Sequence, residues 1–190
     1  MKKDLIKPIN SSFLSCEKDV AIILDKLFTE DKVHANELKR LLVINTKDCL
    51  DMTNERYQKI INEYTVKRLF DEGYIRLTPK LTFEEHDEVR SYILLSFDNF
   101  TPSGNNEFRD CIINFDVVSH IDYWNLQNFQ LRPIKILGYI DGLLNKTKLT
   151  GIGELNFLGA NELILDKELS GYTIMYAAVH GSDDLIPAED

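Results

Sequence analysis

The sequence predicts an α+β fold, in which an amphipathic helix packs on a mainly antiparallel sheet and an N-terminal helical region precedes both. Three observations lead to this prediction. Apolar residues recur at helical spacing within residues 15–73. Apolar and polar residues then alternate in two segments, residues 92–97 and 108–118, as in half-buried strands. Helical spacing returns over residues 131–145.

Residues 1–73 form the predicted N-terminal arm and helical region. Residues 1–14 carry few structural signals, and a first helix is expected from the N-cap Ser15 to about Phe28. A second helix follows over residues 36–43. A third begins at Asn54 and stops at Gly73, a residue type that often ends helices.

Residues 74–184 form the predicted α+β domain, and residues 185–190 form an acidic tail. A short strand is expected at residues 74–77, and residues 80–90 show no clear element. The strands at 92–97 and 108–118 flank Thr101–Asn106, the strongest loop signal in the chain, and therefore form an antiparallel pair. Proline in its first turn fits the helix at 131–145. Strands at 155–157, 163–165 and 172–179 complete the sheet.

Composition limits the classes of partner. The net charge is −9, from 22 Lys and Arg against 31 Asp and Glu, which argues against a general nucleic-acid binder. No apolar stretch approaches the roughly 18 residues that a membrane span needs. The three cysteines form no CxxC pair, and no apolar leader follows the first residues. We therefore expect synthesis and folding in the cytoplasm.

Asp116, His120 and Asp122 are the nearest approach to a metal site or to a hydrolytic centre. They lie where the strand at 108–118 ends, and a small metal-binding or hydrolytic accessory enzyme is the alternative function that they suggest. Polar side chains at such a position also cap a strand exit. On a regular strand, Asp116 and His120 would lie about 13 Å apart, at roughly 3.3 Å per residue. We therefore expect no bound metal, no cofactor and no hydrolytic activity.

Other patterns point away from catalysis as well. Ser119 lies outside any GxSxG elbow, and Cys111 lies on the apolar face of a strand, as a small core residue would. Gly151 and Gly153 have neither a third glycine nor a Walker lysine, and they precede a strand rather than a helix. No catalytic residue is predicted.

An aromatic segment between the strand at 108–118 and the helix at 131–145 is the candidate interface. Its side chains either tuck into the core or anchor a partner protein. The candidate residues are Tyr123, Trp124, Leu126 and Phe129. The polar loop predicted over residues 98–107 is a second feature able to reach a neighbouring subunit.

From Ser91 to Asp184, about half of the chain, the order of elements resembles a known family. The strand Phe108–His120 has a polar exit, and the helix Leu131–Asn145 ends in Ile-Asp-Gly-Leu-Leu. Gly-Ile-Gly-Glu-Leu-Asn-Phe157 and the strand Tyr172–His180 follow. This arrangement resembles the tail-terminator and neck-ring (head–tail joining) proteins of tailed bacteriophages.

The resemblance implies a structural virion protein without catalytic residues. Its subunits would close into a six- or twelve-fold homo-oligomeric ring at the head–tail junction or tail, in contact with other head–tail proteins. DNA would pass nearby without specific binding. The chain would be made in the host cytoplasm, and its place would be the virion tail or neck, with no membrane involved.

Overall fold

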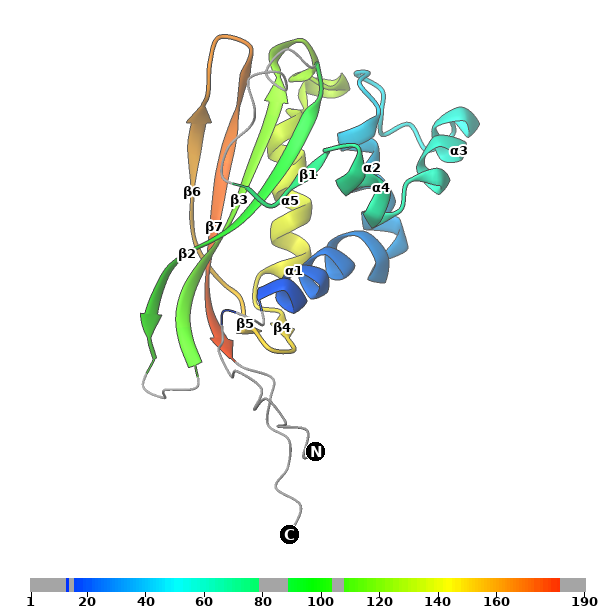
Figure 1. Ribbon diagram of the computed structural model, residues 1–190. Coiled ribbons are helices and arrows are strands. Elements are labelled where there is room, and N and C mark those ends of the chain that lie inside the picture. Colours follow the sequence, from blue (N-terminus) through cyan, green and yellow to red (C-terminus); the bar gives the residue numbers. More distant parts are fainter. Residues whose placement is uncertain (1–12, 14–15, 79–88, 104–107, 182–190) are drawn as a thin grey trace, which may run out of the picture.

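The computed structural model describes residues 13, 16–78, 89–103 and 108–181, and within them one sheet carries helices on one of its faces (Figure 1). The five strands follow the order β1-β2-β3-β7-β6. Their bounds are β1 (Ile75–Arg76), β2 (Ser91–Pro102), β3 (Phe108–His120), β6 (Asn156–Ile164) and β7 (Leu169–Gly181). β1 runs parallel to β2, and the remaining pairs are antiparallel. The predicted α+β fold class is confirmed.

Three of the α-helices begin at a residue whose side chain caps them. The helices are α1 (Cys16–Asp25), which continues into a π-helical turn at Lys26–Glu30, α2 (Lys32–Val43), α3 (Glu55–Glu63), α4 (Val66–Asp71) and α5 (Arg132–Leu144). The Asp31 carboxylate accepts hydrogen bonds from the N–H groups of Val33 and His34. Helix α2 therefore starts four residues before the predicted Asn36. Among the described residues, no helix has both the length and the apolarity to cross a membrane.

The helix predicted from Asn54 to Gly73 is in fact two helices. Tyr64 and Thr65 are extended, with ψ angles of 98° and 165°, and the Thr65 hydroxyl caps α4 by accepting from the N–H of Arg68. Threonine offers this bond to the backbone more readily at a cap than inside a helix. Gly73, with φ at +78°, ends α4 as expected.

The sheet also differs from the prediction at two loops. β2 continues to Pro102 across a bulge at Asn99, whose φ is +51°, so residues 98–102 of the loop predicted at 98–107 are strand, and residues 104–107 lie outside the described residues. The strands predicted at 155–157 and 163–165 are a single strand, β6, with a bulge between Phe157 and Gly159. A bulge lets pairing resume past a residue that would otherwise end it. A small second sheet pairs β4 (Lys148–Leu149) with β5 (Gly153–Glu154).

Four predictions fall wholly or mostly outside the described residues. They concern the arm at 1–14, the cap at Ser15, the segment at 80–90 and the tail at 185–190.

One hydrophobic core joins the N-terminal helices to the sheet through α5. It contains Leu38 and Ile61 from the helical region, Phe115 and Tyr176 from the sheet, and Ile140 from α5 between them. In Figure 1, α5 lies along the sheet with α1 to α4 on its far side. The outcome is three layers that share this core, with α5 in the middle.

A buried arginine at the start of α5 fixes these layers. Arg132 is 0% exposed, and its guanidinium donates to the carbonyl oxygens of Tyr123, Leu41, Ile44 and Thr46 at 2.8, 2.5, 3.1 and 2.7 Å. Leu41 lies in the last turn of α2, Ile44 and Thr46 follow that helix, and Tyr123 lies in the segment before α5. Burial lowers the pKa of Arg132, and the carbonyl dipoles stabilise its charge.

We predict that Arg132→Met destabilises the fold by about 3 kcal/mol or more, because it leaves several buried carbonyls without a donor. Urea denaturation followed by circular dichroism measures the change. Arg56→Met on exposed α3 is the matched control, with an expected effect within about 0.5 kcal/mol. Equal effects of the two variants would show that the Arg132 bonds do not hold the layers together.

Candidate interface groove

The three residues of the candidate metal site do not converge. Asp116 lies within β3 opposite Thr173, whose hydroxyl donates to the Asp116 carboxylate at 2.5 Å. His120, four residues along the same regular strand, accepts from the N–H of Asp122 at 3.2 Å through Nδ1. Among the described residues, no three His, Cys, Asp or Glu side chains are placed to hold one ion. Lack of metal and of hydrolytic activity stays a prediction.

Their local environments explain this arrangement. Burial raises the pKa of Asp116, and the Thr173 bond partly offsets that rise. His120 is buried and caps the 3-10 turn at Ile121–Tyr123, which is the capping role that competes with metal binding at a strand exit. The Glu168 carboxylate lies 3.9 Å from its Nε2 atom.

The four residues of the aromatic segment divide between core and surface. Leu126 is buried within the main core, and Trp124 is half-buried with its ring centroid 6.3 Å from that of Tyr172. Tyr123 is also half-buried, and its carbonyl oxygen accepts from Arg132. Phe129 has a relative exposure of 103%, so its ring contacts solvent on all sides.

Phe129 is held out by an unusual backbone. Asn128 and Phe129 both have left-handed φ angles, +56° and +60°. This conformation is uncommon for any residue except glycine and is costly for a large side chain. Strain of this kind, which exposes an aromatic ring, suggests an anchor for a partner, and that hypothesis leads to a test below.

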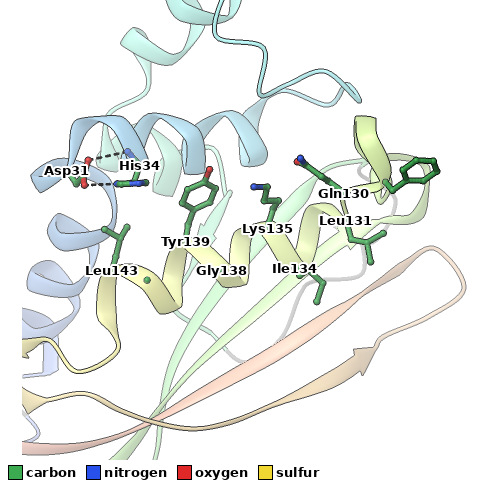
Figure 2. A pocket seen from close by; sticks show the side chains of 11 residues that line it. Asp31, His34, Gln130, Leu131, Ile134, Lys135, Gly138, Tyr139 and Leu143 are labelled. Atoms are coloured by element: carbon green, nitrogen blue, oxygen red, sulfur yellow. Dashed lines mark hydrogen bonds and ion pairs between the residues drawn. The ribbon is translucent and has the colours of Figure 1, made fainter.

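A groove of about 670 Å³ runs along α5, with Gln130 and Leu131 at one end (Figure 2), and the neighbouring Phe129 also lines it. Its floor is the exposed stripe Leu131, Ile134, Gly138 and Gly142. A Cβ added at either glycine would meet no atom within 4 Å, so the space above the helix is open there. The first turn of α2 supplies the opposite end of the groove.

The groove is not among the sequence predictions. A signal for it does exist, because α5 carries two apolar stripes: the buried one at Ile136, Ile140 and Leu144, and the exposed one at Leu131 and Ile134. A helix that packs only on its sheet needs one stripe. The residues at the start of α2 that line the groove could not be predicted from the sequence, because their position depends on how α2 and α5 pack.

The polar end of the groove is an ion pair. Nδ1 of His34 lies 2.6 Å from Oδ2 of Asp31, the residue that caps α2. The hydrogen bond and the charge of Asp31 raise the pKa of His34, and the same bond lowers the pKa of Asp31. The attraction is therefore complete between the two pKa values, and it is lost as the pH rises through that of His34.

We predict that Asp31→Asn lowers the pKa of His34 toward its ordinary value, because asparagine keeps the helix cap but removes the charge. An NMR titration of the His34 ring protons measures this shift. Glu37→Gln, which removes a weaker and more distant contribution, is the control and should move the pKa much less. An unchanged pKa in Asp31→Asn would contradict the ion pair.

A second prediction for this region tests whether the Phe129 ring stabilises the fold or contacts a partner protein. Phe129→Gly should leave the free energy of unfolding unchanged or raise it by up to about 1 kcal/mol, since the ring buries nothing and glycine relieves the left-handed strain. Asn128→Gly is the control, because it places glycine at the neighbouring left-handed position but keeps the ring. Thermal unfolding and association with other protein chains are measured for both variants.

If Phe129 anchors a partner, Phe129→Gly weakens assembly and Asn128→Gly does not. Normal assembly of Phe129→Gly would show that Phe129 is not part of the interface. A lower unfolding free energy in Phe129→Gly would mean that the ring packs on the fold.

Comparison with known proteins identifies the family to which the chain belongs. A search of curated proteins found no significant match. The YomW family model matches residues 35–178, which run from α2 almost to the end of β7 and include α5 and the groove floor. YomW is a phage-derived family. Since the match spans well over half of the sequence, the chain belongs to the phage-derived YomW family.

Proposed function

We propose that this chain is a structural virion protein that forms a ring at the phage head–tail junction or tail, as a neck ring or tail terminator. The ring would join connector and tail around the DNA channel. The observation that carries the proposal is the match to a phage-derived family across α2 to β7. The resemblance of residues 91–184 to head–tail joining proteins gives the proposal its specific role.

The proposal includes the absence of enzymatic activity. The Cys111 thiol is buried in the core, and burial raises its pKa to about 12, so it is protonated at neutral pH and a poor nucleophile. Asp116 and His120 are engaged with Thr173 and with the N–H of Asp122. These bonds support structural roles for both side chains.

The charge of the chain suits a wall beside passing DNA. With a net charge of −9, a ring of many copies would repel the phosphate backbone rather than bind it. Specific contacts would instead go to protein neighbours. The groove along α5 and the exposed Phe129 offer an apolar surface for such a neighbour.

The test is deletion of the gene in the phage that carries it. We expect lysates with separate heads and tails and few joined particles, because the joining ring is missing, as seen by negative-stain electron microscopy. Supplying the wild-type chain in trans should restore joined particles. Normal joined particles that lack this chain would contradict the proposal.

A further inference from the structure

The outer edge of β6 is a candidate site for pairing with a further strand. β6 is the last strand of the sheet, and no other described strand pairs with its free side (Figure 1). Phe157, Leu158 and Ile164 are exposed by 47%, 53% and 67%. The strand Asn156–Ile164 contains no Lys, Arg or Pro, the residues that commonly protect an edge, and its one charged residue is Glu162. Long apolar edges of this kind recruit a further strand.

The backbone of β6 presents hydrogen-bonding groups on that side. The N–H of Leu165 donates to the carbonyl oxygen of Leu169 in β7, so Leu165 points inward to its neighbour strand. Peptide groups alternate along an antiparallel strand, and the pairing is regular from Gly159 to Ile164. The N–H and C=O groups of Ala160 and Glu162 therefore point away from β7, toward the free edge.

The opposite edge of the same sheet is open over part of its length. β1 pairs with β2 at Ile93 and Leu94, and no described strand pairs with residues 95–102 on that side. The N–H of Ile93 donates to Tyr74, so the alternation turns the peptide groups of Leu95 and Phe97 to the same side. The sheet thus has two edges able to accept strands, one at each end.

The strand directions make these two edges fit each other. Successive pairs β2–β3, β3–β7 and β7–β6 are all antiparallel, so β2 and β6 run in opposite directions. A second copy placed beside β6 in the same orientation brings its β2 antiparallel to β6. The helical layer then stays on the same side of the extended sheet in both copies.

We propose that β6 of one copy pairs with residues 95–102 of β2 in a second copy. This contact joins two different surfaces of identical chains, so repetition either closes into a ring or continues as a filament. The inference names the contact between subunits, and it rests on the proposed ring for its biological role. Phe97 and Phe100 of β2 are half-buried and pack against the core of their own copy, so the contact proposed here is made by the backbones of the two strands.

The test compares proline and alanine at Glu162 in the full chain. Glu162→Pro removes an N–H that points to the free edge, where proline is tolerated by the fold, whereas Glu162→Ala removes the same side chain and keeps the N–H. Sedimentation velocity over a concentration series measures association of the chain with itself. We expect the wild type and Glu162→Ala to associate, and Glu162→Pro to associate at least about tenfold more weakly.

Ile164→Lys is a second variant of the same edge, and it tests the contact without introducing proline. Ile164 is exposed by 67%, so the fold tolerates lysine there, and a charge on the edge should also weaken association. Thermal unfolding confirms that each variant is folded. Equal association of wild type, Glu162→Pro and Ile164→Lys would overturn the proposal, as would a wild-type chain that stays monomeric throughout.

Complementation of the deletion phage separates this inference from the proposed function. If Glu162→Pro prevents association in solution and deletion leaves particles joined, the contact stands and the virion role fails. If deletion separates heads from tails and Glu162→Pro restores joining completely, the virion role stands and the contact fails. A wild-type monomer that loses function on Glu162→Pro would assign the edge to a strand of another protein and overturn pairing between copies.

Discussion

Arg132 is the residue on which the arrangement of this molecule depends most. A guanidinium that is 0% exposed needs hydrogen-bond acceptors inside the protein, and the carbonyl oxygens of Tyr123, Leu41, Ile44 and Thr46 accept from all three of its nitrogen atoms. The bonds join the end of α2, the loop after β3 and the first turn of α5. Planar geometry with several donors suits arginine to this task better than lysine.

The two candidate contact surfaces relate to this junction in different ways. The groove needs α2 to lie across from α5, because the Asp31–His34 pair on α2 faces the stripe on α5. Phe129 projects from the loop that Arg132 holds through the Tyr123 carbonyl. The edge of β6 depends instead on strand order, which places β7 between β3 and β6. One surface is thus a product of helix packing and the other of sheet topology.

Patterns over a few residues were enough to predict most elements of the fold. Alternation in residues 108–118 and helical spacing in residues 131–145 gave β3 and α5 with errors of one or two residues at most ends, because each element buries one face. The errors arose where one side chain decides the backbone. Asp31 starts α2 early, Thr65 divides a helix, and Asn99 carries β2 through an expected loop.

The candidate surfaces were less accessible from the sequence. The segment of Tyr123 to Phe129 could be singled out by its apolar residues, yet its division into a buried Leu126 and an exposed Phe129 depends on left-handed backbone angles. Asparagine at 128 is compatible with such an angle, but phenylalanine at 129 gives no sign of one. The free edge of β6 requires the strand order, which long-range pairing determines. The local periodicity of the sequence carries no information about the exposure of Phe129 or about the strand order.

We propose that copies of this chain close into a ring in the phage particle. Cryo-electron microscopy of the native head–tail junction tests it most directly, because a map shows both the position of the chain and the symmetry of its neighbours. We predict a closed ring of identical subunits, six or twelve in number, in which β6 of each subunit lies antiparallel to β2 of the next. A single copy without symmetric neighbours, or a junction from which this chain is missing, would contradict it.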